Sequence, residues 1–114
     1  MVEQGEIYEY DFGVAGPDSR QAGTRPALII QTDHLNRVTG YGLTIVVPLS
    51  RTGRPSPSHV RLEPTAENGL SDVLFAKCEQ IFTVPADGLR GRRGAIAAND
   101  MFNIRAALRA VLTL

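Results

Sequence analysis

The sequence is poor in the residues that build disulfide-rich, zinc-bound or membrane-embedded proteins. Its 114 residues include one cysteine, Cys78, one lysine, Lys77, and no tryptophan. A single cysteine excludes an internal disulfide and a cysteine-rich metal site, and its flanking pattern indicates a buried strand residue. No apolar run approaches the roughly 20 residues that span a bilayer. The acidic start MVEQGEIYEYDF does not resemble a secretory signal. We therefore predict a cytoplasmic protein with no membrane association.

The composition is that of one soluble globular domain. Hydrophobic residues make up 43% and charged residues 21% of the chain, far from the composition of disordered proteins. A chain of this length fits one domain, residues 1–114. The net charge of zero conceals an uneven distribution, because acids crowd residues 3–18 whereas arginines gather at 51–61 and 90–93. Arginine suits phosphate geometry, so these local basic segments are candidate contacts for a phosphate-bearing partner.

Alternation and short apolar runs predict a mainly β fold. Residues 6–12 alternate apolar and acidic side chains, as expected of a half-buried strand. Residues 27–31 and 43–50 are short β-branched runs that indicate two central strands covered on both faces. Pro48 is expected near a strand end or a bulge, because it has no N–H to donate. Further strands are predicted at 59–63, 73–76 and 80–84.

Two polar loops and one helix complete the predicted architecture. Residues 13–23 and 51–58 are rich in glycine, proline and serine, and long loops of this kind often carry function. The tail predicts a helix with Asn99 as its N-cap. Its apolar residues at helical spacing are Met101, Ile104, Leu108 and Val111. The pattern indicates a small, strongly bent antiparallel barrel with a C-terminal helix, which does not distinguish an enzyme from a binding module.

Several segments, in order along nearly the whole chain, carry a family resemblance. They read GEIYEYDFG, QAGTRPALII, IVVPLS, SHVRL and VLFAKCEQIFTV. This order resembles the MazF/PemK-like toxins of type II toxin-antitoxin systems. The resemblance implies a homodimeric SH3-like antiparallel barrel of the MazF/PemK/CcdB type. It also implies a sequence-specific endoribonuclease, an mRNA interferase, that cuts single-stranded RNA without metal or other cofactor and thereby inhibits translation and growth.

The resemblance further implies a mechanism and partners. The substrate's own 2′-hydroxyl attacks the phosphorus, leaving a 2′,3′-cyclic phosphate and a 5′-hydroxyl, so DNA is not cut. A cognate antitoxin is expected to lay an acidic, disordered tail along the RNA groove. Operator DNA is expected to bind only to the toxin-antitoxin complex.

Individual site residues follow from the matched motifs. The arginine of the Arg-Pro motif falls on Arg25 and the hydroxyl residue of the third strand on Ser50, which are the predicted catalytic residues. Arginine can hold two phosphoryl oxygens and remains charged. Where many members carry a glutamate in the first loop, this chain has Arg20. The predicted RNA-binding residues, including two from the second polar loop, are Arg20, Gln21, Thr24, Arg51, Arg54 and Gln80.

The sequence leaves the acceptor of the 2′-hydroxyl proton open. His59, Glu79 and solvent are the candidates, whereas His34 belongs to a polar TDHLNR turn or short helix. Two other functions also stay open. One is a CcdB-like toxin that acts by binding a protein, although the Trp-Gly-Ile ending of that family is replaced here by VLTL. The other is a catalytically inactive RNA-binding relative, which the substitution by Arg20 would suit.

Overall fold

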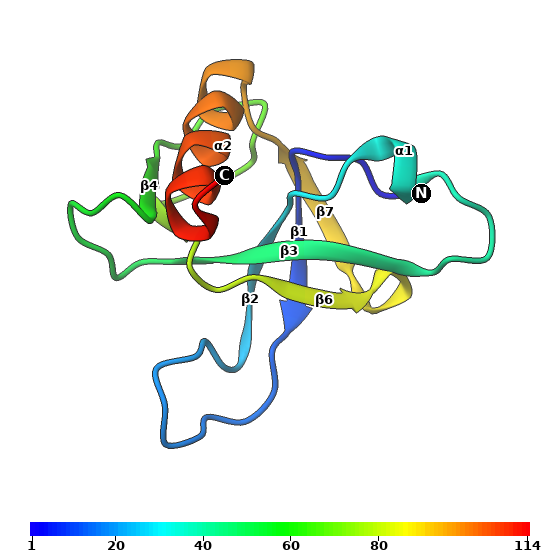
Figure 1. Cartoon of the computed structure of the whole chain (residues 1–114), viewed down its shortest axis with the longest axis horizontal. Coiled ribbons are helices and arrows are strands. Elements are labelled where there is room, and N and C mark those ends of the chain that lie inside the picture. The colour runs from blue at the N-terminus through cyan, green and yellow to red at the C-terminus, as the bar shows by residue number, and fades with distance from the viewer.

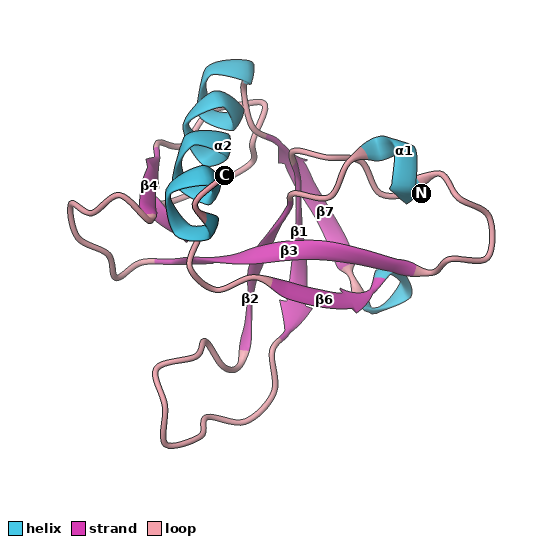
Figure 2. Ribbon diagram, viewed as in Figure 1, coloured by secondary structure: helices cyan, strands magenta, loops and turns pink.

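Strands dominate the computed structural model, which describes all residues, Met1–Leu114. The elements in chain order are β1 (Glu6–Asp11), β2 (Thr24–Ile29), α1 (Asp33–Asn36), β3 (Leu43–Ser50), β4 (His59–Leu62), β5 (Leu74–Lys77), β6 (Phe82–Pro85), the 3-10 turn η1 (Ala86–Gly88), β7 (Arg90–Ala95) and α2 (Ala98–Leu112). Figure 2 shows the single long helix beside the strands. The predicted fold class, mainly β with a C-terminal helix, is confirmed, and His34 lies in the short helix α1.

The sheet is built around β3, which has two partners in succession on one edge. The strand order is β4-β5-β3-β2-β1-β7, and β6 pairs with β3 outside this path. Val46 pairs with Phe82 of β6, whereas Leu49 pairs with Ala76 of β5. Pro48 lies between these two pairings, where that ladder is interrupted and a missing N–H is tolerated. The sheet bends strongly but does not close, because β4 and β7 remain its ends (Figure 1).

Both faces of the central strands are covered, as predicted. Leu28 and Val47 belong to the larger apolar cluster, whereas their neighbours Ile29 and Val46 belong to a second one. Successive side chains of a strand point to opposite faces, so β2 and β3 separate the two clusters. Helix α2 covers the larger cluster, and its buried residues are Met101, Ile104 and Ala107.

The helix start and one strand differ from the sequence predictions. Asn99 is not the N-cap: α2 begins at Ala98, and its N-cap Ala97 makes no side-chain capping bond. Strand β7 was not predicted because RGRRGA lacks alternating apolar residues. It pairs with β1 through Ile7 and Gly94. A Cβ at Gly94 would lie 2.1 Å from the carbonyl oxygen of Glu67, so only glycine permits this close approach.

Cys78 is fully buried, which confirms the predicted burial, but it lies in the turn directly after β5 and not in a strand as predicted. Its backbone N–H donates to the carbonyl oxygen of Ser58. Burial, with a smaller contribution from the charge of Glu79, raises the pKa of its thiol to about 12. The thiol therefore stays protonated near neutral pH and is a poor nucleophile.

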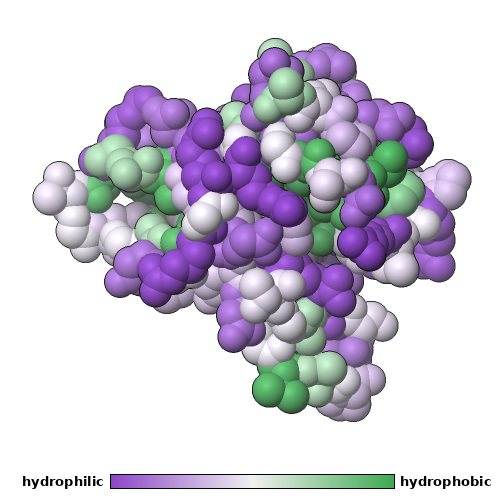
Figure 3. All heavy atoms as spheres, turned by 180° about the vertical axis from the view of Figure 1, so that it is seen from behind, coloured by the Kyte–Doolittle hydropathy of each residue, from purple (hydrophilic) through white to green (hydrophobic).

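The loop between β1 and β2 projects away from the body (Figure 1). Its tip carries apolar atoms (Figure 3), and Val14 is 95% exposed. None of the helices has the length and apolar character needed to cross a membrane.

Asn68 holds the connection between β4 and β5. It is 1% exposed, and its Oδ1 accepts hydrogen bonds from the N–H groups of Thr65 and Leu70. Its Nδ2 donates to the carbonyl oxygen of Glu63 at 2.8 Å. One side chain therefore satisfies three backbone groups of this turn.

We expect Asn68→Ala to lower the free energy of unfolding by about 2 kcal/mol or more, because it leaves buried backbone groups without partners. Urea denaturation measures this change. Asn103→Ala on the exposed face of α2 is the matched control, with an expected change within about 0.5 kcal/mol. Equal stability of the two variants would contradict the role assigned to Asn68.

Candidate functional site

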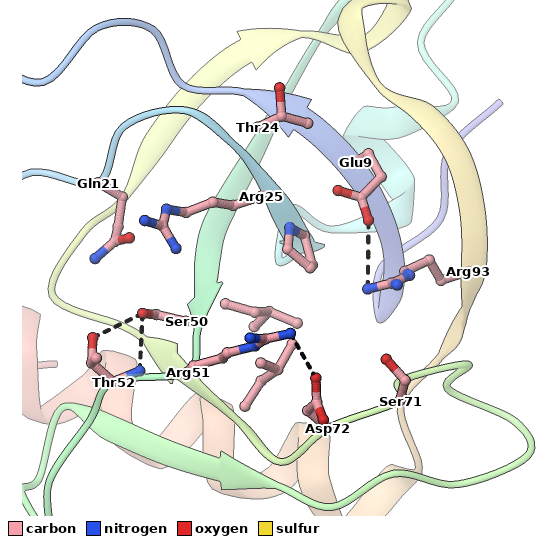
Figure 4. A pocket seen from close by; sticks show the side chains of 13 residues that line it. Glu9, Gln21, Thr24, Arg25, Ser50, Arg51, Thr52, Ser71, Asp72 and Arg93 are labelled. Atoms are coloured by element: carbon pink, nitrogen blue, oxygen red, sulfur yellow. Dashed lines mark hydrogen bonds and ion pairs between the residues drawn. The ribbon is translucent and has the colours of Figure 1, made fainter.

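An open pocket of about 480 Å³ lies where β1, β2 and the end of β3 meet two loops. We call it the first pocket (Figure 4). Polar and charged side chains predominate among its lining residues, which are Glu9, Gln21, Thr24, Arg25, Pro26, Leu49, Ser50, Arg51, Thr52, Ser71, Asp72, Leu74 and Arg93.

The pairing of β2 with β3 brings Arg25 close to Ser50. Ala27 pairs with Pro48, and continuing this antiparallel register by two residues sets Arg25 opposite Ser50. The ladder itself ends at Ala27, so the two side chains are beyond the last pair and face the pocket. Sequence reasoning assigned these two residues separately, and the structure brings them together (Figure 4).

Arg25 is the only arginine of the first pocket without a carboxylate partner. Arg51 donates to Asp72 at 3.0 Å, and Arg93 lies 3.5 Å from a carboxylate oxygen of Glu9. Arg25 is half-buried, and its Nε donates to the carbonyl oxygen of Ala22 at 2.8 Å. This bond orients the guanidinium and leaves its terminal nitrogens free of any protein acceptor. The pocket therefore presents one oriented cation whose charge is not neutralised by a neighbour.

Ser50 is the last residue of β3 and is 3% exposed. Its Oγ lies 3.0 Å from the hydroxyl oxygen of Thr52 and accepts a hydrogen bond from the Thr52 N–H at 3.2 Å. These contacts hold the hydroxyl at the edge of the pocket. Because one hydroxyl donates to the other, one O–H of the pair remains to donate to an anionic ligand.

Gln80 ties the long loop to the body of the protein. Its Oε1 accepts from the N–H of Gln21 at 2.7 Å, and its Nε2 donates to the carbonyl oxygen of Ser19 at 3.1 Å. Gln21 and Ser19, which precede Gln80 by 59 and 61 residues, are thus held beside the first pocket. The predicted site residues Gln21 and Gln80 are therefore in direct contact.

Arg20, at the loop position where the family resemblance leads one to expect glutamate, is paired within its own loop. Its Nε and one terminal nitrogen donate to the two carboxylate oxygens of Asp18 at 2.9 and 2.5 Å. These bonds lower the pKa of the exposed Asp18 carboxyl to about 2. Arg20 does not line the first pocket but a neighbouring hollow that also contains Ile81 and Phe82.

His59 and Glu79 lie together in a second pocket of about 340 Å³. The lining residues are Ser19, Thr52, Gly53, Arg54, His59, Lys77, Glu79 and Gln80. The His59 side chain is 8% exposed, and its Nε2 lies 3.0 Å from a Glu79 carboxylate oxygen. Its Nδ1 accepts the Arg54 N–H at 3.3 Å, so the ring proton resides on Nε2 and is donated to Glu79.

Burial by itself would raise the pKa of Glu79, but the hydrogen bond from His59, with smaller contributions, leaves that pKa below its ordinary value. The carboxylate is therefore ionised near neutral pH. The imidazole is held between an anion and a backbone donor.

The predicted site residues thus fall into adjoining pockets. Gln21, Thr24, Arg25, Ser50 and Arg51 line the first pocket, and Arg54, His59, Glu79 and Gln80 line the second.

Sequence reasoning missed the five other polar or charged lining residues of the first pocket, which are Glu9, Thr52, Ser71, Asp72 and Arg93. The sequence shows the arginine cluster at residues 90–93, but it does not show that these residues form a strand paired with β1. The structure contains no group of three or more His, Cys, Asp or Glu side chains placed to hold a metal ion.

Comparison with known proteins places the chain in a family. The family described as PemK-like, MazF-like toxin of type II toxin-antitoxin system matches residues 3–112. A probable endoribonuclease MazF from Mycolicibacterium smegmatis is 32% identical over 108 residues, covering 94% of this chain and 93% of the relative.

Solved structures agree with this assignment. An endoribonuclease in complex with its cognate antitoxin from Mycobacterial species has a TM-score of 0.83 and 25% identity, covering 100% of this chain and 97% of the other. MazF from Deinococcus radiodurans shares the fold with a TM-score of 0.77 and 22% identity, covering 99% and 97%. From the length of the sequence match and the shared fold, the chain belongs to the PemK-like, MazF-like family of toxins of type II toxin-antitoxin systems.

Proposed function

We propose that the protein is an endoribonuclease toxin that cuts single-stranded RNA at the first pocket. The observation that carries the proposal is Arg25, an oriented and unneutralised guanidinium beside the hydroxyl of Ser50. A phosphodiester is a single negative charge with two free oxygens, which a guanidinium can hold at once. The 32% identical relative, a probable endoribonuclease, supports the same activity.

The reaction uses the 2′-hydroxyl of the substrate as nucleophile. This hydroxyl gives up its proton as its oxygen bonds to the adjacent phosphorus. The bond to the 5′-oxygen breaks, and the departing oxygen takes up one proton from the group that accepted the first or from water, so that a 2′,3′-cyclic phosphate and a 5′-hydroxyl remain. Negative charge builds on the phosphoryl oxygens as the new bond forms. Arg25 stabilises that charge, and Ser50 donates a hydrogen bond to one of the same oxygens. No group other than the substrate's hydroxyl is needed as nucleophile, and DNA lacks that hydroxyl.

Proton transfer in this proposal involves the His59–Glu79 pair. The long loop supplies no acid equivalent to the glutamate of many relatives, because Arg20 replaces it and Asp18 is bound to Arg20. Glu79 remains ionised and accepts a hydrogen bond from Nε2 of His59. For His59 to accept a proton from substrate, its 3.3 Å bond from the Arg54 N–H must be exchanged for the substrate hydroxyl.

The proposed partners follow from the same groove. An antitoxin with an acidic, disordered tail would place carboxylates where RNA phosphates bind, and the solved mycobacterial relative is described in complex with its cognate antitoxin. We further propose a cytoplasmic homodimer that contacts operator DNA only within the toxin-antitoxin complex. A catalytically inactive RNA-binding protein is the second candidate, and the replacement of the loop acid by Arg20 is the observation that favours it.

We expect the purified protein to cut a long unstructured RNA in the presence of EDTA, and Arg25→Ala to be about 10²–10³ times slower, because a positioned donor to developing charge is lost. Cleavage rates and end-group analysis measure this. Arg109→Ala, an exposed and unpaired arginine of α2, is the matched control and should cut at the wild-type rate.

Three outcomes would contradict the proposal for different reasons. Cleavage abolished by EDTA refutes a metal-free reaction, and undiminished cleavage by Arg25→Ala removes Arg25 from its role. RNA that binds wild-type protein but stays intact identifies an inactive RNA-binding relative. A DNA oligonucleotide of matching sequence should remain uncut.

We expect the Glu79 carboxyl to titrate below pH 4.5 in the wild-type protein and at higher pH in His59→Phe. The variant removes the Nε2–H donor, while burial, which raises the pKa, remains. NMR detection of the side-chain carboxyl during a pH titration measures both values. His34→Phe, at an exposed histidine, should leave the Glu79 titration unchanged.

The lowered pKa of Glu79 also determines how the stability of the folded protein changes with pH. A lowered folded-state pKa means that the contribution of Glu79 is complete above about pH 4.5 and is lost as pH falls through the lowered value. His59→Phe should therefore show a shallower loss of stability in that acid range. Identical titrations in wild type and His59→Phe would show that this hydrogen bond does not control the carboxylate.

A further inference from the structure

The first and second pockets adjoin each other at two places. Thr52 lines both, and its hydroxyl oxygen lies 3.0 Å from that of Ser50. On the other side Gln21 of the first pocket donates to Gln80 of the second at 2.7 Å. Figure 4 shows Arg25, Gln21, Ser50 and Thr52 at the same end of the first pocket, with Glu9 and Arg93 at the other. The unpaired guanidinium is therefore at the end that lies beside the second pocket.

The second pocket has an excess of positive charge. Its lining contains no hydrophobic residue, and its cations Arg54 and Lys77 have no carboxylate within ion-pair distance. Its single acid is Glu79, which accepts a hydrogen bond from His59. The first pocket has three arginines against two carboxylates. Each pocket thus has one positive charge in excess, the complement of one phosphodiester.

The neighbouring hollow beside Ile81 and Phe82 has the opposite character. It contains two acids, Asp18 and Glu79, and its single arginine, Arg20, is bound to Asp18. A phosphate would meet repulsion there. A nucleic acid backbone that leaves the first pocket is therefore directed past Thr52 into the second pocket.

The floor and wall of the second pocket are held by packing. His59 and Lys77 are directly opposed across the β4–β5 ladder. The Arg54 segment is fixed over this strand pair, because a Cβ on Gly53 would lie 2.2 Å from Cγ of Phe75, and because the Arg54 N–H donates to His59. Arg54 and Lys77 are thus brought to one cavity from a loop and a strand.

We propose that the second pocket is a subsite for the phosphate adjacent to the one being cut, held by Arg54 and Lys77. The proposal rests on the proposed function, because it describes the same RNA strand one nucleotide further along. Two consecutive phosphates are then bound, the reacting one at Arg25 and its neighbour at the second pocket. The subsite contributes to binding and not to the chemical step, so its loss should raise KM and leave kcat nearly unchanged.

The experiment uses oligodeoxynucleotides with one ribonucleotide at a cut position mapped on the long RNA. In a series of these, one neutral methylphosphonate linkage replaces a phosphate at each position in turn around the cut. With wild-type protein we expect one linkage next to the cut to raise KM about tenfold when neutral. Arg54→Gln/Lys77→Gln should raise KM for the unmodified substrate to a similar extent and show no further loss at that linkage.

Matched controls separate the subsite from general charge and from folding. Arg105→Gln/Arg109→Gln removes two exposed charges from α2 and should retain the full sensitivity to the neutral linkage. Circular dichroism and thermal melting report whether each variant is folded. The methylphosphonate series on wild-type protein needs no variant at all. The slope of log KM against log salt should fall by about 0.7 for the lost phosphate contact.

Each possible result of the experiment either supports or overturns the proposed subsite. A single sensitive linkage whose effect disappears in Arg54→Gln/Lys77→Gln establishes the subsite. Equal sensitivity in wild type and variant, or no sensitive neighbour in the wild type, overturns the subsite while the endoribonuclease function stands. No cleavage of any substrate, including the long RNA, overturns the proposed function and the subsite together.

Discussion

The site depends on the register between β2 and β3. Ala27 pairs with Pro48, and this single pairing determines that Arg25 and Ser50 emerge opposite each other where the ladder ends. A shift of one residue would turn every side chain of β2 to the other face. The shift is prevented by the alternation of buried residues, because Leu28 and Val47 pack under α2 while Ile29 and Val46 pack on the opposite face. Core packing therefore places the functional pair.

The arrangement of charge gives the pocket its chemical character. Arginine is abundant in this chain, and most of the arginines near the site are held by acids. Arg51, Arg93 and Arg20 bind Asp72, Glu9 and Asp18 respectively. Arg25 differs because its acceptor is the backbone carbonyl of Ala22, which orients the side chain without neutralising it. Within the first pocket, Arg25 is thus the one guanidinium that no carboxylate neutralises.

Most strands could be predicted because their residues alternate or form β-branched runs. The prediction for residues 43–50 matches β3 from its first to its last residue, and the burial of Cys78 was also predicted correctly. Strand β7 was missed because its sequence carries no apolar period, and it forms by pairing with β1 and by the close approach at Gly94. Asn99 was assigned as a cap on local preference, but α2 begins at Ala98 without a side-chain cap.

By itself the sequence determined the fold class and the family and proposed Arg25 and Ser50 as site residues, because strand periodicity and motif order are local and are read along the chain. The tertiary structure decided which arginine of the first pocket is unpaired, how Gln80 holds the long loop, and that His59 and Glu79 share a cavity. These are relations between side chains far apart in sequence, and they arise when pairing and packing bring separate strands together. The sequence specifies which residues are charged, but the fold determines whether a neighbouring residue neutralises that charge.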